Sequence, residues 1–273
     1  MMKVGFIGLG NQGGPMARRI VESGFPLTLW ARRPASLQPF ADTAATIASI
    51  PAELGAASDL VAICVVADAD VEDVLLRSDG VLAGMSPGGI VAIHSTIHPD
   101  TCQRLGEEAS QRGITVVDAP VSGGGSAAAE RRLLVMVGGE DADIERCRPV
   151  FETYGNPIVH TGPFASAQLA KLLNNLLFTA QITLALDTFA FADQLGVDRT
   201  ALAQVLTNGS GGSRVVEILA GSGFNLGGLR HAVSLLEKDL GITRDVARAR
   251  GVTAPPSVTS LAHATLDMLS GPG

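Results

Sequence analysis

The sequence has few cysteines and fewer basic than acidic residues. The three cysteines, Cys64, Cys102 and Cys147, are odd in number and unclustered, which argues against a disulfide framework or a cysteine-rich metal site. The formal net charge is −7 and no basic patch stands out, so nucleic acid is not an expected partner. Charged residues make up only 17% of the chain and hydrophobic residues 46%, a balance that excludes disorder and predicts a well-buried globular protein.

The sequence also lacks a clear targeting segment and a clear membrane span. Its start, MMKVGFIGLG, is too short and too rich in glycine for a secretory signal peptide. The most apolar run, residues 176–192, is interrupted by Gln181, Asp187 and several threonines, and no basic flank follows it. We therefore expect a buried soluble helix, no membrane association and a cytoplasmic location.

The stretch from Ser166 to Gly196 has no proline and no internal glycine. Its apolar residues do not alternate as in a half-buried strand, so it predicts one long helix that ends at Gly196. Because it is apolar almost all round, we expect neighbours to bury it on most sides. Lys171 and Asn175 share one face near its start. A lysine and an amide placed together indicate a candidate site, although a lysine reaching for solvent at a helix end would give the same pattern.

The beginning of the chain has the pattern of a dinucleotide-binding βαβ unit. A short apolar run at residues 3–7 precedes GLGNQG, and a helical pattern follows over residues 14–23. In such a turn Gly8 allows the tight bend, Gly10 lets a pyrophosphate approach the backbone, and Gly13 lets the helix pack on the strand. The phosphates would meet the N–H groups at the helix start. The candidate cofactor-binding residues of this turn are Gly8, Leu9, Gly10, Asn11, Gln12 and Gly13. A plain glycine-rich turn is the alternative, and the position at the first strand-to-helix turn favours the cofactor.

The end of the second predicted strand, residues 26–30, indicates the type of cofactor. An NAD enzyme usually carries a carboxylate there, about 20 residues past the glycines. This sequence has Arg32 and Arg33 instead, and charged, forked guanidinium groups suit a 2′-phosphate. We therefore expect NADP, with NAD still possible. A solvated basic pair without a ligand is the alternative explanation.

The alternation of strands and helices continues through the first part of the chain. Further strands are predicted at residues 59–66, 89–93, 114–118, 133–137 and 157–160. Helices are predicted to begin at residue 71 and to span residues 99–111 and 141–151. In open α/β sheets ligands bind beyond the carboxyl ends of the strands. Val65, Val66, Ser95 and Thr96 fall at such ends.

The loop after Asp118 is a second candidate binding segment. It contains Ser122 followed by Gly123, Gly124 and Gly125. Successive exposed backbone N–H groups in such a loop can hold a carboxylate. A flexible glycine turn without a ligand would explain the same sequence equally well. Beyond Gly196, helices are predicted at residues 198–206, 214–220, 229–250 and 258–269. We expect that one face of the preceding α/β domain does not fully cover the long apolar helix and these helices, which predicts a homodimer or homotetramer.

Five motifs, taken together and in order, resemble the β-hydroxyacid dehydrogenases, a family that includes 3-hydroxyisobutyrate dehydrogenase and tartronate semialdehyde reductase. The motifs are GLGNQGGPMARRI, IHSTIHPDT, DAPVSGGG, KLLNN and EKDL. The resemblance implies an α/β NAD(P)-binding Rossmann domain over residues 1–163. It implies an all-α domain over residues 164–273, joined to the first by the long interdomain helix.

The same resemblance implies roles for individual residues. Lys171 would be the catalytic acid/base, and Asn175 would help to hold the substrate. Ser122, Gly123 and Gly124 would bind the substrate carboxylate. On the cofactor side, the implied residues are Thr96 by the nicotinamide, Lys238 closing over the site, and Val65, Val66 and Val71 lining the adenosine.

Several positions depart from the family pattern. The family usually has methionine at Gln12, Leu-Pro near Val65-Val66, glycine at Ala165 and Ala167 just before the helix, and an acidic residue at His94. Several members have an aromatic residue where Arg214 stands. The two alanine methyl groups could crowd the active site or change its backbone. These departures bear on the choice of substrate more than on the chemistry.

These observations together predict reversible hydride transfer between NADP(H) and a small 3-hydroxy acid or its semialdehyde. Two alternatives remain open. An imine reductase has the same architecture but usually replaces the lysine with aspartate or tyrosine. A non-catalytic nucleotide-binding module of the same fold would have little need for Lys171, Asn175 and the glycine-rich loop together.

Overall fold

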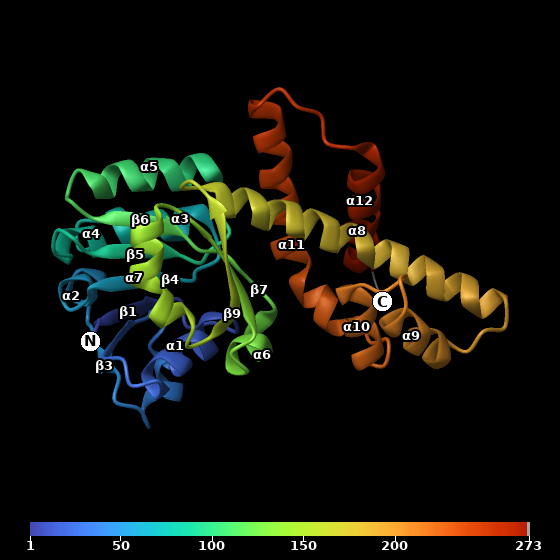
Figure 1. The fold of residues 1–273 in the computed structure, drawn as a ribbon, viewed down its shortest axis with the longest axis horizontal. Coiled ribbons are helices and arrows are strands. Elements are labelled where there is room, and N and C mark those ends of the chain that lie inside the picture. The colour runs from blue at the N-terminus through green and yellow to red at the C-terminus, as the bar shows by residue number, and fades with distance from the viewer. Residues whose placement is uncertain (272–273) are drawn as a thin grey trace. The chain divides into compact units, whose positions relative to one another are not determined.

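The computed structural model describes residues 1–271, which form two compact units. Unit 1 runs from Met1 to Lys171, and unit 2 begins at Leu172. The division falls inside the long helix α8, Ser166–Gln194. The predicted combination of a parallel-sheet nucleotide-binding fold and a helical second part is confirmed (Figure 1).

Unit 1 is built around one sheet that has nine strands in the described residues. They are β1 (Val4–Ile7), β2 (Leu27–Trp30), β3 (Thr46–Ile47), β4 (Leu60–Ile63), β5 (Ile90–Ile93), β6 (Thr115–Asp118), β7 (Val121–Ser122), β8 (Leu133–Gly138) and β9 (Gly155–Gly162). The order is β3-β2-β1-β4-β5-β6-β8-β7, with β9 paired to β8. Strands β1 to β6 are parallel, whereas β8 runs antiparallel to β6 and β7. The order reverses between β1 and β4, which is where such sheets bind their ligands.

Helices cover both faces of the sheet. They are α1 (Gly13–Glu22), the 3₁₀ helix η1 (Pro34–Phe40), α2 (Pro51–Ala56), α3 (Asp68–Leu76), α4 (Val81–Gly84), α5 (Pro99–Ser110), α6 (Gly124–Ala129) and α7 (Asp141–Phe151). Side chains alternate across each strand, so Phe6 joins the core with α1, α6 and α7, and Ile7 joins the core with α2 to α5. Burial on both faces explains why β1, β4 and β5 are continuous apolar runs.

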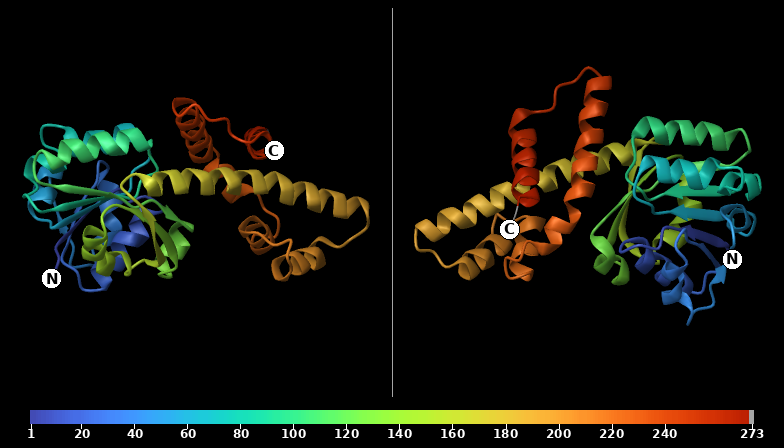
Figure 2. Two further views of the ribbon diagram at one scale, coloured as in Figure 1. Left: turned by 45° about the horizontal axis from the view of Figure 1, so that its top comes forward. Right: turned by 180° about the vertical axis from the view of Figure 1, so that it is seen from behind.

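Within the described residues, unit 2 contains the greater part of α8 and four further helices, which are orange to red in Figures 1 and 2. They are α9 (Arg199–Asn208), α10 (Arg214–Gly221), α11 (Gly227–Ala249) and α12 (Pro256–Ser270). Helix α8 ends as predicted, because Gly196 has a φ of 71° and the N–H of Val197 reaches back to the carbonyl of Ala192. Inside unit 2, the Thr183 hydroxyl lies 2.7 Å from the Thr265 hydroxyl of α12.

The expectation that neighbours bury α8 on most sides is wrong for this single chain. Leu173, Leu177, Leu184 and Phe191 are 50–61% exposed. By length and composition alone α8 could cross a membrane, and 39% of its most apolar window is buried. The buried hydroxyl of Thr183 bonds to Thr265 of α12, and that of Thr179 donates to the carbonyl of Asn175 within α8, which is how a packed helix satisfies polar side chains. The helices of unit 2 therefore cover one side of α8 and leave an apolar stripe on another.

The short elements are those that the sequence did not predict. Strands β3 and β7 and helices η1, α2, α4 and α6 have two to seven residues each, too few to leave a periodic pattern. Strand β4 ends at Ile63, three residues before the predicted end at Val66. The predicted loop after Asp118 is in fact strand β7 followed by helix α6.

Candidate active site

The turn between β1 and α1 has the geometry that its glycines predict. Gly8 has a φ of 101°, and a Cβ there would lie 2.1 Å from the carbonyl oxygen of Cys64. A Cβ on Gly13 would lie 2.0 Å from the carbonyl oxygen of Gly8. Neither position accepts a side chain without a shift of the backbone. Around Gly10 the space is open to 4 Å, so a ligand can approach the backbone there.

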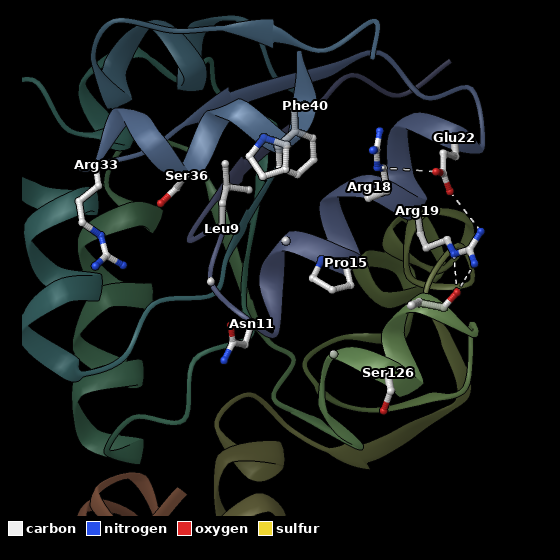
Figure 3. Close-up of a pocket in the computed structure, with 15 residues that line it drawn as sticks. Leu9, Asn11, Pro15, Arg18, Arg19, Glu22, Arg33, Ser36, Phe40 and Ser126 are labelled. Carbon is white, nitrogen blue, oxygen red and sulfur yellow. Dashed lines mark hydrogen bonds and ion pairs between the residues drawn. The ribbon is translucent and has the colours of Figure 1, made fainter. Parts of the chain in front are cut away.

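A cavity of about 960 Å³ adjoins this turn (Figure 3). Its walls come from the turn itself, from α1, from η1 and from α6. Leu9, Gly10 and Asn11 line it, and their binding of a cofactor stays a prediction. The amide nitrogen Nε2 of Gln12 is, among the described residues, the one buried side-chain nitrogen or oxygen without a hydrogen-bond partner. A buried donor of this kind lowers the stability of the protein until a polar ligand accepts a hydrogen bond from it. The turn and the cavity therefore fit a bound dinucleotide, and a hydrogen bond from Gln12 to that ligand stays a prediction.

Arg32 and Arg33, which were predicted to bind the cofactor together, have different surroundings in the structure. A guanidinium nitrogen of Arg32 lies 3.0 Å from Asp70 and 3.5 Å from Asp73, both on α3. Arg33 lines the cavity together with Ser36 of η1 (Figure 3). Sequence reasoning could not foresee the acidic partners of Arg32, because they lie 38 and 41 residues away. Of the two arginines, Arg33 is the one that lines the cavity, and its binding of a 2′-phosphate stays a prediction.

The three valines predicted beside the adenosine differ in their surroundings. Val65 donates its backbone N–H to the hydroxyl of Ser95 at 2.8 Å, which ties the end of β4 to the end of β5. Val66 is 60% exposed and is accessible to a ligand. Val71 is fully buried in the core beneath α3. Packing in this core is enough to explain a valine at position 71, and its place beside an adenosine stays a prediction.

The segment predicted to bind a carboxylate lies between β7 and α6. Gly123 and Gly124 have φ values of 131° and 76°, a backbone that turns the chain from Ser122 into the helix. Gly125 lies so close to the cofactor turn that a Cβ there would be 2.2 Å from the carbonyl oxygen of Asn11. The segment is thus ordered and adjoins the cofactor turn, and carboxylate binding by it stays a prediction.

The start of α8 rests on a buried carboxylate that the sequence reasoning missed as a functional group. Asp118, at the end of β6, accepts hydrogen bonds from the N–H groups of Ala165 at 2.8 Å and Gln168 at 2.9 Å. Burial raises the pKa of Asp118, and these backbone bonds oppose the rise. Ala165 has a φ of 72°, so it adopts the left-handed backbone that glycine would supply. Ala167 lies within α8 and not before it, and both methyl groups are buried.

His94 is a second buried polar group close to the ends of these strands. Its Nδ1 lies 2.6 Å from the carbonyl oxygen of Ala119, and its Nε2 lies 3.0 Å from the hydroxyl of Tyr154. Nδ1 therefore donates to the carbonyl, and Nε2 accepts from the hydroxyl. Burial lowers the pKa of His94 to about 4. The neutral ring thus joins β5 to the segment that leads into β7.

Lys171 and Asn175 lie one turn apart on α8, and each is only 9% exposed. Within unit 2, Asn175 donates from Nδ2 to Asp239 at 2.6 Å and accepts from Asn174 at 3.0 Å. Lys238 of α11 donates to the other oxygen of Asp239 at 2.7 Å. The amide of Asn175 is thus held in one orientation. Asp239, which the sequence reasoning did not single out, links two predicted site residues.

The fold and the cofactor turn define a class, the NAD(P)-dependent oxidoreductases with a Rossmann domain followed by helices. Residues 3–162 match the family model described as the NAD binding domain of 6-phosphogluconate dehydrogenase. Residues 165–271 match the one described as NAD-binding of NADP-dependent 3-hydroxyisobutyrate dehydrogenase. The chain belongs to the β-hydroxyacid dehydrogenase family, as its motifs indicated.

Named relatives match almost the whole chain. An L-threonate dehydrogenase of Cupriavidus necator is 33% identical, over 99% of this chain and 91% of the relative. An NAD-dependent L-serine dehydrogenase of Pseudomonas aeruginosa is 31% identical, over 93% and 88%. The solved structure of a Mycobacterium tuberculosis 3-hydroxyisobutyrate dehydrogenase with L-serine is 28% identical, with a TM-score of 0.84 over 99% of this chain and 93% of that one. An imine reductase from Pseudomonas sp., 18% identical with a TM-score of 0.65, shares the fold alone.

Proposed function

We propose that this protein interconverts a small 3-hydroxy acid and its semialdehyde, with NADP(H) as the preferred cofactor and Lys171 as the general acid/base. The observation that carries the proposal is the pair on α8. Lys171 and Asn175 are both buried and one turn apart, and Asp239 fixes the amide of Asn175. A buried amine next to an oriented amide is suited to hold and move one proton of an alcohol. The bound cofactor would accept or supply the hydride.

The residues of this chain then divide the work. Lys171 takes the hydroxyl proton during oxidation and returns it during reduction of the aldehyde. Asn175 orients the oxygen that gains or loses that proton. Ser122, Gly123 and Gly124 hold the carboxylate of the substrate, so that the reacting carbon is presented in one pose. Thr96 and Lys238 complete the proposed site on the cofactor side.

Two observations support the proposed substrate class: the segment from Ser122 to Gly124, which we propose binds a carboxylate, and the names of the relatives. Threonate, serine and 3-hydroxyisobutyrate, which appear in the names of the relatives, are all short acids with a hydroxyl group. The test is a panel of 3-hydroxy acids and semialdehydes with NADP(H) and NAD(H), followed by nicotinamide absorbance. Turnover of at least one short hydroxy acid supports the proposal. Cofactor binding without turnover of any of them would favour a non-catalytic module.

The preference for NADP rests on Arg33 and Ser36 in the cavity wall. A guanidinium and a hydroxyl suit a 2′-phosphate, although one relative is named as NAD-dependent. Arg33→Ala should lower the ratio of kcat/KM with NADPH to that with NADH about tenfold, the effect of losing one charge-assisted hydrogen bond. Arg32→Ala is the matched control, because Arg32 pairs with Asp70 and Asp73. A ratio that already favours NADH in the parent would overturn this preference.

We also propose that a second copy of this chain covers the apolar stripe of α8 and that the protein is cytoplasmic. Leu173, Leu177, Leu184 and Phe191 are too large and too exposed to stay in water without cost. Light scattering on the purified protein should give the mass of a homodimer or homotetramer. A monomer at micromolar concentration would contradict the assembly.

A further inference from the structure

Gln168 is a fully buried side chain on the first turn of α8 that makes two hydrogen bonds to one distant segment. Its Nε2 donates to the carbonyl oxygen of Ser95 at 2.9 Å. Its Oε1 accepts from the N–H of Ile97 at 3.1 Å. These are the two neighbours of Thr96 in the chain. A single amide group therefore clamps the backbone on both sides of Thr96.

The clamp is itself anchored. The backbone N–H of Gln168 donates to Asp118 at 2.9 Å, and the N–H of Ala165 donates to the same carboxylate at 2.8 Å. Because Asp118 ends β6, the first turn of α8 is tied to the ends of both β5 and β6. Lys171 follows Gln168 by three residues on the same helix, so any shift of the clamp changes the placement of Lys171 relative to Thr96.

Other contacts hold the same segment from the opposite side. The hydroxyl of Ser95 accepts from the N–H of Val65 at 2.8 Å. Asp68, the first residue of α3, accepts from the N–H of His98 at 2.9 Å. These bonds tie the segment to the connection between β4 and α3. Gln168 supplies the tie to α8, and the segment keeps its other bonds if the amide is lost.

We propose that Gln168 is a positioning residue: its amide fixes the Ser95–Ile97 segment against α8, and so keeps Thr96 and Lys171 in register for the reaction. The inference rests on the proposed function. An amide is required because one group must donate to a carbonyl and accept from an N–H at the same time. Methionine has a similar length and does neither, so Gln168→Met removes the clamp while filling the space.

The kinetic test compares Gln168→Met with the parent on the best substrate of the panel. A misplacement of about 1 Å can cost about 100-fold in rate, so we expect kcat to fall 10- to 100-fold. The KM of the hydroxy acid and the Kd of NADPH should change less than threefold. The deuterium isotope effect on kcat should rise as hydride transfer becomes rate-limiting. A fall in affinity with kcat intact would overturn the positioning role.

A matched control separates positioning from lost stability. Ser58 is buried in unit 1 and donates to the carbonyl oxygen of Leu54 at 2.6 Å, so Ser58→Ala also removes a buried side-chain-to-backbone bond. It should lower the melting temperature without lowering kcat. If Ser58→Ala lowers kcat as much as Gln168→Met does, the effect is general destabilisation and the proposal is overturned.

Amide hydrogen exchange provides a readout that does not depend on turnover. Exchange at Ile97 should accelerate at least tenfold in Gln168→Met and stay unchanged in Ser58→Ala. Unchanged exchange at Ile97 overturns the clamp, whatever the activity. Faster exchange with unchanged kcat overturns the positioning role and leaves the proposed function intact. If the parent turns over no substrate, the proposed function is wrong and the positioning role is wrong with it. Faster exchange at Ile97 in Gln168→Met then shows only that the amide holds the segment structurally.

A second variant covers the case in which methionine does not fold. Gln168→Glu keeps an acceptor for Ile97 and loses the donor to Ser95. It should lose at least fivefold in kcat because the bond to the Ser95 carbonyl is lost, while exchange at Ile97, whose acceptor is kept, should accelerate less than in Gln168→Met. An unchanged kcat in Gln168→Glu would overturn the positioning role. If neither variant folds, Gln168 is a residue of stability alone, and the proposal is overturned.

Discussion

The cofactor turn and the start of α8 are two polar regions of unit 1 built in opposite ways. The turn is made of six consecutive residues, Gly8–Gly13, and leaves Gln12 Nε2 without a protein partner. The start of α8 is assembled from segments 47–73 residues apart, and its carboxylate and amide bond only to the protein. The first region fits a ligand, and we propose that the second holds Lys171 and Thr96 in place for the reaction. Substitutions in the first should therefore act on binding, and substitutions in the second on stability and rate.

The largest effect on stability is expected from Asp118→Ala. The N–H groups of Ala165 and Gln168 would lose their acceptor, at about 1–3 kcal/mol each, offset in part because the buried charge disappears as well. We expect the free energy of unfolding in urea to fall by about 3 kcal/mol. Asp198→Ala is the control, since Asp198 caps α9 in the same way at an exposed position and should cost about 1 kcal/mol. Equal losses would show that the start of α8 is an ordinary helix cap.

Acid should weaken the same neighbourhood through His94. Its pKa is lowered by burial to about 4, below the value of about 6.5 in an unfolded chain. The stability that His94 contributes is complete above about pH 6.5 and is lost as the pH falls toward 4, to a limit of about 3 kcal/mol. The raised pKa of Asp118 acts in the opposite direction, but it is present in parent and variant alike. The free energy of unfolding should therefore fall more steeply between pH 7 and pH 4.5 in the parent than in His94→Gln. Equal slopes would mean that the ring is protonated in the folded protein.

The smallest effect is expected at the cofactor turn. Gln12→Met removes the unpaired donor, so the cofactor-free protein should gain about 1 kcal/mol in unfolding free energy. We predict that Nε2 of Gln12 donates to the bound cofactor, so the same change should raise the Kd of NADPH about three- to tenfold. Gln103→Met, at an exposed position on α5, is the control and should change neither quantity. Tighter NADPH binding by Gln12→Met would contradict the role given to this amide.

The same contrast explains what could be predicted from the sequence. The turn at Gly8–Gly13 and the buried strands could be predicted from the local sequence. The same is true of the length of α8 and its end at Gly196. The bonds of Asp118 and Gln168 join residues far apart in the chain, and no local pattern encodes them. Burial of α8 was mispredicted because an apolar helix surface does not indicate what covers it. The split between Arg32 and Arg33 depends on Asp70 and Asp73, which share no motif with them.

The most direct measurement on the central claim is the turnover of Lys171→Ala, with NADPH binding measured on the same preparation by fluorescence. The account predicts a loss of about 10²–10⁴-fold in kcat, the usual contribution of one acid/base group, together with a Kd for NADPH within threefold of the parent. A kcat close to that of the parent, with NADPH bound normally, would show that another group moves the proton.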